Sequence, residues 1–254
     1  PTAIPTATPK PTPYADLTTK GPYFVYERKQ NDQVALVIMD ADGSGRKVFD
    51  LPSNAVLQTL KERISPDGKW VVLHTGTAGE ASNFDENKKY DLALHIIRIS
   101  DGQVINITNI LSPDYPRSFL KLQDLLAKKY PSYSSEILRG TLWTFLGGIK
   151  VFSWSPDSQH LSFAGEMDGP SSDLYVYDLQ TKNIRRLTDG IENIGSIYFS
   201  DDGKWIHHTS APFPSQGNYR TSWRALLDGT KVEFISSGNT SSNGISRPTP
   251  PEIK

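Results

Sequence analysis

Ile64-Ser65-Pro66-Asp67-Gly68-Lys69-Trp70-Val71-Val72-Leu73 is the stretch that indicates the fold, because similar stretches recur twice further along the chain. The second copy is WSPDSQHLSF, residues 154–163, and the third is FSDDGKWIHH, residues 199–208. The turns of these two copies begin at Ser155 and Ser200, which lie 45 residues apart. A repeat of about 40 to 45 residues has the length of one four-stranded propeller blade.

The Ser-Pro-Asp-Gly part of the repeat predicts a tight turn between two strands. Pro66 presets φ, the Asp67 carboxylate hydrogen-bonds nearby backbone, and Gly68 adopts a positive φ. We expect the strand before each turn to be the innermost of a blade and the strand after it to be the second. One blade cannot bury both of its faces, so blades stack on one another around a ring.

Short apolar runs separated by Gly, Asp, Asn, Ser and Pro clusters begin at Gly21 and continue along the chain, as is typical of many short strands joined by turns. The expected strands are 23–26, 34–39, 47–50, 70–74, 92–99, 104–108, 161–164, 174–177, 184–187, 197–199, 205–209, 222–226 and 232–235. The predicted fold is therefore all-β, a β-propeller of about four recognisable four-stranded blades over residues 21–248.

The repeat turn, the strand 173–178 (DLYVYD) and the strand that begins IRRLT at Ile184 resemble the TolB-type, WD-repeat-like β-propeller family over about residues 22–248. Members of that family include a periplasmic component of an envelope complex, which works by binding other proteins, and N-terminal domains of prolyl-oligopeptidase-like peptidases. The resemblance implies a propeller that binds protein or serves a peptidase. TolB-type propellers commonly have six blades, whereas four are recognisable here.

The two ends of the repeat region bear on whether the ring closes. The first blade begins at Tyr23 with what resembles a second strand, so its innermost strand is missing. Near the other end, Gly244-Ile245-Ser246 aligns with Gly195-Ser196-Ile197, where an innermost strand starts. We expect this C-terminal segment to complete the first blade and close a four-bladed ring. A part of a larger propeller, or a chain completed by a partner, is the alternative.

One segment, residues 111–149, departs from the strand pattern. Pro116 precedes a run in which Phe119, Leu122 and Leu126 recur at helical offsets, so we expect a helical insertion. Its basic and aromatic side chains suit an interface. The candidate binding residues are Phe119, Lys121, Lys128, Lys129, Tyr130, Tyr133 and Trp143. A purely structural packing role is the alternative.

The two termini differ in composition from the repeats. Pro and Thr dominate the first 13 residues, which favours an extended polyproline II conformation, and we interpret residues 1–20 as a stalk or linker. A plain disordered terminus is the alternative. Residues 249–254 are expected to form a short C-terminal tail.

Composition excludes several classes of function. Lys plus Arg number 27 and Asp plus Glu number 28, which argues against nucleic-acid binding, because that activity needs a basic excess. The absence of Cys excludes disulfides, thiolate metal sites and cysteine nucleophiles. No apolar run approaches the roughly 20 residues of a transmembrane helix.

Motifs for metals and catalysis are weak. Asp40, Asp42 and Ser44 begin like a calcium loop, but Leu51 stands where that loop needs a bidentate Glu, so we favour a β-turn. His207 and His208 are neighbours on a predicted strand and point to opposite faces, so they cannot share an ion. No G-x-S-x-G elbow or Walker loop is present. We therefore expect no cofactor and name no catalytic residue.

These observations favour a non-enzymatic propeller that binds a protein or a glycan outside the cytoplasm, in the periplasm, secreted or at the cell surface, tethered by the Pro/Thr stalk. Two alternatives stay open. One is a glycan-active enzyme, or the propeller domain of a peptidase whose catalytic part lies outside this chain. The other is a self-assembling subunit of a surface structure.

Overall fold

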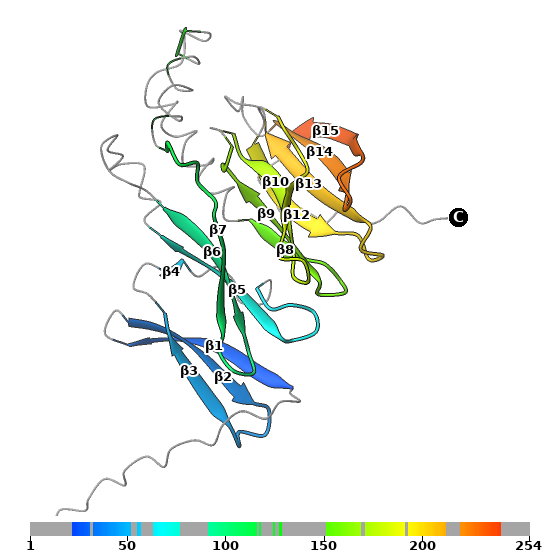
Figure 1. Cartoon of the computed structure of the whole chain (residues 1–254). Coiled ribbons are helices and arrows are strands. Elements are labelled where there is room, and N and C mark those ends of the chain that lie inside the picture. Colours follow the sequence, from blue (N-terminus) through cyan, green and yellow to red (C-terminus); the bar gives the residue numbers. More distant parts are fainter. Residues whose placement is uncertain are drawn as a thin grey trace, which may run out of the picture.

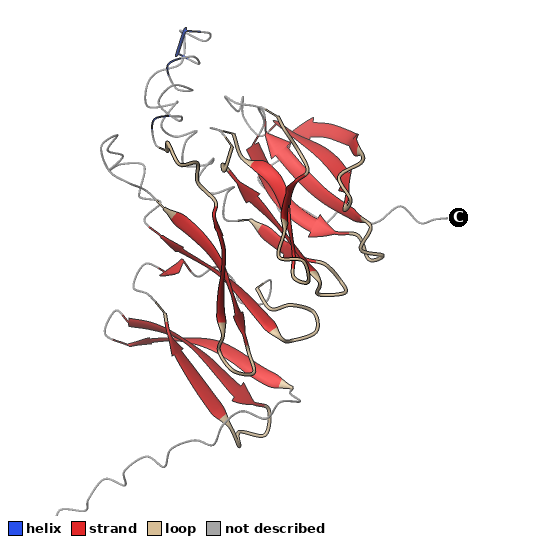
Figure 2. Cartoon of the chain, in the orientation of Figure 1, coloured by secondary structure: helices blue, strands red, loops and turns tan. Residues whose placement is uncertain are grey.

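The computed structural model describes residues 22–30, 33–51, 55–56, 63–76, 91–115, 117, 124, 127–128, 151–168, 171–190, 193–211 and 219–239. The strands of this part form four separate antiparallel sheets, which succeed one another along the chain (Figures 1 and 2). Sheet 1 has three strands and sheets 2, 3 and 4 have four each. The prediction of an all-β fold with about four blades is confirmed.

Each sheet is a meander in which consecutive strands are hydrogen-bonded neighbours. Sheet 1 contains β1 (Tyr23–Gln30), β2 (Gln33–Asp40) and β3 (Arg46–Asp50). Sheet 2 contains β4 (Ala55–Val56), β5 (Trp70–Gly76), β6 (Leu92–Arg98) and β7 (Val104–Asn109). Sheet 3 contains β8 (Phe152–Trp154), β9 (His160–Gly165), β10 (Asp173–Asp178) and β11 (Ile184–Arg186). Sheet 4 contains β12 (Asn193–Phe199), β13 (Trp205–Ala211), β14 (Tyr219–Leu226) and β15 (Val232–Asn239).

The repeat turns have the structure that their residues predict. In each turn the serine hydroxyl donates a hydrogen bond to the aspartate two residues later, over 2.6 Å at Ser65, 2.5 Å at Ser155 and 2.6 Å at Ser200. The same aspartate accepts the backbone N–H two residues further on. Gly68 and Gly203 both have a φ of +70°. These turns connect the first strand of sheets 3 and 4 to the second, as expected.

Ser158 occupies the position that glycine holds in the other two turns, and its φ is +61°. A left-handed conformation costs a non-glycine residue about 1–2 kcal/mol. The Ser158 side chain is buried, and its Oγ accepts a hydrogen bond of 3.0 Å from the backbone N–H of Asp67. Asp67 belongs to the turn of sheet 2, so this bond links neighbouring sheets and offsets the strain.

Ser158→Ala is expected to lower the free energy of unfolding by about 1–2 kcal/mol, because it keeps the strained φ and removes the hydrogen bond. Ser158→Gly removes the bond and the strain together, so it should stay within about 1 kcal/mol of wild type. Urea unfolding followed by far-UV circular dichroism measures both. An alanine variant as stable as the glycine variant would contradict this account of the turn.

The core of the described part of the chain consists of three apolar layers, one between each pair of consecutive sheets. Alternation along a strand sends successive side chains to opposite faces. On β5, for example, Val71 and Leu73 pack toward sheet 1, whereas Val72 packs toward sheet 3. A third layer joins sheets 3 and 4 through residues such as Val176 and Ile206. Each inner sheet is thus covered on both faces, as blades of a propeller are.

The predicted closure of a four-bladed ring is not seen. Sheets 1 and 4 lie at opposite ends of an open arc, with sheets 2 and 3 between them (Figure 1). Among the described residues, no apolar cluster joins sheet 4 to sheet 1. Among the described residues, sheet 1 lacks an innermost strand, as expected, and β1 is its edge on that side. The proposed latch, Gly244-Ile245-Ser246, lies outside the described residues.

The helical insertion predicted over residues 111–149 is not supported, because the described part of the chain contains no helix with bounds of its own. Most of that stretch lies outside the described residues. Four isolated positions with helical backbone, 117, 124, 127 and 128, are described, and all four are exposed. Residues 1–20 and 249–254 also lie outside the description. Within it, no helix is both long enough and apolar enough to span a bilayer.

Candidate functional site

A groove of about 1200 Å³ opens between sheets 3 and 4, at the end of the sheets where the Ser155 and Ser200 turns lie. Two further turns border it, β10–β11 and β14–β15. Apolar side chains form part of its lining, namely Val176, Ile184, Leu226 and Leu227. Its charged and titratable side chains are Asp157, Asp178, Asp201, Asp202, Asp228, His160, Arg185 and Lys204.

Four of these aspartates are held in place by their own turns. Asp157 and Asp202 belong to the repeat turns described above. The Asp178 Oδ1 atom accepts the backbone N–H groups of Gln180 and Thr181, both at 2.8 Å. The Asp228 Oδ1 atom accepts the backbone N–H of Thr230 at 2.9 Å and its hydroxyl at 2.7 Å. The local turn sequence therefore fixes where each carboxylate lies.

These hydrogen bonds keep the four carboxylates ionised. The Ser200 hydroxyl lowers the pKa of Asp202, the Thr181 N–H lowers that of Asp178, and the Thr230 N–H lowers that of Asp228. Burial opposes the change at Asp157, but the bonds that it accepts still lower its pKa. The groove therefore stays negatively charged across the physiological pH range.

The groove also contains cationic groups, which neutralise only part of this charge. The Arg185 guanidinium donates a hydrogen bond of 3.2 Å to the Leu227 carbonyl, and the Lys204 ammonium lies 3.9 Å from Asp202. His160 lies between two carboxylates, with Nδ1 3.8 Å from Asp157 and Nε2 3.6 Å from Asp178. Five aspartates against one arginine and one lysine leave an excess of negative charge beside apolar surface. Lysine and arginine side chains match this combination, because they join a cationic head to an aliphatic stem.

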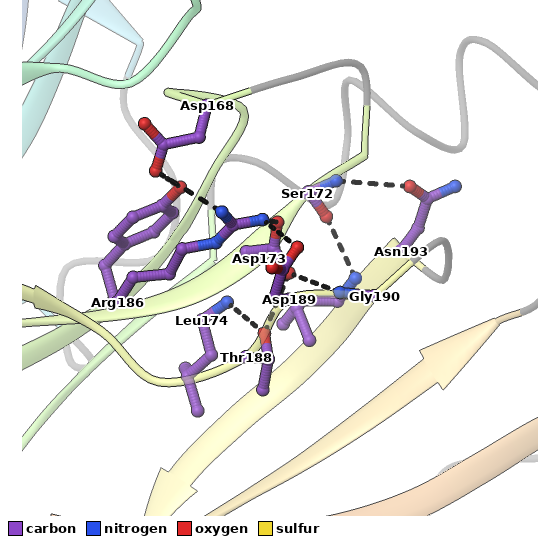
Figure 3. Close-up of polar contacts among 11 residues, drawn as sticks. Asp168, Ser172, Asp173, Leu174, Arg186, Thr188, Asp189, Gly190 and Asn193 are labelled. Carbon is purple, nitrogen blue, oxygen red and sulfur yellow. Dashed lines mark hydrogen bonds and ion pairs between the residues drawn. The ribbon is translucent and has the colours of Figure 1, made fainter. Parts of the chain in front are cut away.

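A second polar cluster is centred on Arg186 (Figure 3). It lies at the opposite end of sheet 3 from the groove, where β10 begins and β11 ends. The Arg186 Nη2 atom lies 2.7 Å from both Asp173 and Asp189, and its Nη1 atom lies 3.7 Å from Asp168. The Tyr175 hydroxyl donates a hydrogen bond of 2.9 Å to Asp168. Three carboxylates thus surround one guanidinium.

Asp173 joins two loops in this cluster. It also accepts the Thr188 hydroxyl at 3.0 Å and the Gly190 backbone N–H at 3.1 Å (Figure 3). Thr188 in turn accepts the backbone N–H of Leu174. Burial raises the pKa of Asp173, although Arg186 opposes that change. Because Asp173 and the two Arg186 Nη atoms pair within the cluster, we interpret it as a structural link between the loop before β10 and the loop after β11.

The candidate binding residues of the predicted insertion are not tested by the structure. Phe119, Lys121, Lys129, Tyr130, Tyr133 and Trp143 lie outside the described residues. Lys128 is described and is exposed. Their role in binding stays a prediction.

The candidate calcium residues form the β2–β3 turn, as favoured from the sequence. The Asp42 carboxylate accepts the Ser44 backbone N–H at 2.9 Å and the Ser44 hydroxyl at 2.6 Å, and Gly43 has a φ of +77°. Asp40 is buried at the base of the turn. In the described residues, no three His, Asp or Glu side chains are grouped as a metal site would need.

Sequence reasoning missed the groove, although it identified the turns that form it. The aspartate of the repeat turn was interpreted as a turn residue, one repeat at a time, and Asp178 and Asp228 were not singled out. The available signal was the recurrence of aspartate in all four turns, SPDS, DLQT, SDDG and DGT, that end adjacent strands of consecutive blades. Their convergence depends on how sheets 3 and 4 stack, which no single repeat specifies.

Comparison with known proteins supports the fold and leaves the function open. No family model matches the chain. An uncharacterized protein of Agrobacterium fabrum is 33% identical over 82 residues, which are 32% of this chain and 26% of that protein. These values do not assign the chain to a family.

Three solved structures share the architecture at low sequence identity. A chain from a structural analysis of two prolyl endopeptidases matches with a TM-score of 0.53 and 14% identity, over 87% of this chain and 29% of that one. TolB from Acinetobacter baumannii matches with a TM-score of 0.46 and 17% identity, over 84% of this chain and 40% of that one. The β-propeller domain of the Trilobed protease from Pyrococcus furiosus matches with a TM-score of 0.47 and 16% identity, over 88% of this chain and 58% of that one. This chain is a β-propeller module that spans less than two thirds of each of these chains.

Proposed function

We propose that this module is non-enzymatic and binds a partner protein by accepting a lysine- or arginine-rich segment in the groove between sheets 3 and 4. The carrying observation is the combination, in one groove, of turn-held aspartates with the apolar side chains of Ile184 and Leu226. A cationic head would meet the carboxylates while its aliphatic stem covers the apolar lining. Negative charge also speeds the encounter with a basic partner.

The same proposal places the module outside the cytoplasm, with residues 1–20 as the stalk that holds it away from a surface. The Pro and Thr content of that segment supports the stalk, because prolines favour an extended, semi-rigid chain. The candidate residues of the segment 111–149 would then add a second contact with the partner.

The test removes charge from the groove while keeping the turns. Asp157→Asn, Asp202→Asn and Asp228→Asn are combined, since asparagine retains the acceptor oxygen that each turn needs. The probe is a fluorescein-labelled octapeptide of alternating Lys and Leu, with binding measured by fluorescence anisotropy at low and moderate salt. We expect affinity to fall about 10- to 100-fold, because three of the five groove carboxylates lose their charge.

A matched control exists at turns outside the groove. Asp42, Asp67 and Asp101 also accept the backbone N–H two residues later, and they belong to sheets 1 and 2. Replacing these three by Asn changes the net charge equally, and we expect less than a twofold change in affinity. Equal losses of affinity in both triple variants would mean that overall net charge, and not the groove, determines binding. If the Lys–Leu peptide does not bind to wild type, the proposal is refuted.

A further inference from the structure

The two sheets at the ends of the arc each have one face without a neighbour among the described residues. Positions counted from the turn serine show which face this is on sheet 4. Val72 and Ser162, each seven residues after a turn serine, lie on the faces directed toward the next sheet. The corresponding residue of sheet 4 is His207, and Ile206 beside it packs back toward sheet 3. The open face of sheet 4 is therefore the kind that receives a following blade.

Aromatic rings line this open face of sheet 4. The Tyr198 and His207 rings stack with centroids 4.9 Å apart and an interplanar angle of 5°. The Arg224 guanidinium lies over the Trp205 ring, 4.2 Å from its centroid, and pairs with Glu233 at 2.6 Å. Lys231 also pairs with Glu233, so both cations have a carboxylate partner within the sheet. Stacked rings and an arginine held over an indole make a surface that another sheet can cover.

Sheet 1 has the reciprocal face. Leu36 and Ile38 on β2 pack toward sheet 2, so the residues that alternate with them on β2 face away from sheet 2. In sheets 2, 3 and 4, the face on that side contacts the preceding sheet. That other face carries three large apolar side chains with substantial exposure, Phe24 at 55%, Tyr26 at 37% and Val48 at 40%. Tyr26 and Val48 flank Val37 in register across the three strands, and Val37 itself is completely buried. The exposed apolar surface of this face therefore consists of Phe24, Tyr26 and Val48.

We propose that the open face of sheet 1 packs on the open face of sheet 4 of a second copy of this chain, head to tail. The pairing repeats the relation of the three sheet interfaces within the chain, where a face directed toward the next blade meets a face directed toward the preceding one. The two faces belong to opposite ends of one arc, so a second copy supplies the partner face (Figure 1). Such a heterologous contact closes into a ring or continues as a chain. The inference is independent of the groove proposed above.

Two variants block the two faces separately. Variant A combines Phe24→Lys and Val48→Lys on sheet 1. Variant B is Ser222→Arg on sheet 4, where Ser222 pairs with Thr209 on the open face. Sedimentation velocity from 5 to 200 μM, with far-UV circular dichroism as the folding check, should show wild type above its 28.2 kDa monomer mass and each variant at the monomer mass.

Mixing the variants tests the head-to-tail arrangement. Variant A retains an intact sheet 4 face and variant B an intact sheet 1 face, so the mixture should form a dimer of one copy each and nothing larger. Phe234→Lys, at a 53% exposed Phe outside both faces, should assemble like wild type. A wild type that is monomeric at 200 μM overturns the proposal. So does assembly that survives in the folded variants A and B, or a mixture that stays monomeric.

Discussion

Phe163→Ala is expected to lower the free energy of unfolding by about 3–5 kcal/mol, which is a large part of the 5–15 kcal/mol that stabilises a typical domain. Phe163 has no exposed surface and lies in the apolar layer between sheets 2 and 3. Its ring stacks on Tyr175 with centroids 5.6 Å apart and an interplanar angle of 18°. Truncation would leave a cavity in the layer that joins the two halves of the arc.

Urea unfolding at neutral pH, followed by far-UV circular dichroism and tryptophan fluorescence, measures this loss. The matched control is Phe234→Ala, because Phe234 is 53% exposed and contacts Trp223 edge to face. We expect the control to cost no more than about 1 kcal/mol. Similar losses at the two positions would mean that the inter-sheet layer is not what holds the sheets together.

The blades could be predicted from the sequence because the information that specifies them is local. Ser65, Asp67 and Gly68 make a turn among themselves, and the apolar alternation on either side specifies the strands. Every expected strand lies within or overlaps an observed one. Ser158 shows that the turn survives a non-glycine residue when a contact from the preceding sheet compensates.

The arrangement of the blades was not predictable in the same way. Closure of the ring depends on contacts between residues more than 200 positions apart, for which a short alignment at Gly244 was the only signal. The groove requires four turns from two sheets to converge. The Arg186 cluster shows the same limit. IRRLT was identified as a strand pattern, but the carboxylate partners of Arg186 come from the first residue of β10 and from the loops before β10 and after β11.

Glu166 is a further feature that no sequence pattern indicated, and Glu166→Gln is expected to stabilise the protein at neutral and alkaline pH. The side chain is completely buried just after β9, where the Glu166 backbone N–H donates a hydrogen bond of 2.7 Å to the Ile110 carbonyl. In the part of the chain that the structure describes, neither carboxyl oxygen has a hydrogen-bond partner. Burial therefore raises the pKa of Glu166 well above its ordinary value of 4.5.

The direction of the pH dependence follows from this raised pKa. The native protein retains the Glu166 proton over a pH range in which the unfolded chain has lost it. The contribution of Glu166 to the free energy of unfolding is therefore most favourable below about pH 4.5, the ordinary pKa. It falls as pH rises from there to the raised pKa of the native state. The slope in that window approaches about 1.4 kcal/mol per pH unit for one group. Glutamine cannot ionise, so the variant should lack this slope.

Urea midpoints of wild type and Glu166→Gln, measured from pH 4 to pH 9, isolate the contribution because all other groups are common to both proteins. The difference should be small at pH 4 and should grow in favour of the variant as pH rises.

Glu233→Gln is the opposite case, since the hydrogen bonds from Lys231 and Arg224 lower the pKa of Glu233. There the wild-type carboxylate stabilises the native state above its ordinary pKa, and this advantage is lost as pH falls. A difference between wild type and Glu166→Gln that stays constant with pH would show that Glu166 is hydrated or paired in solution, and the buried carboxyl would then cease to explain any alkaline loss of stability.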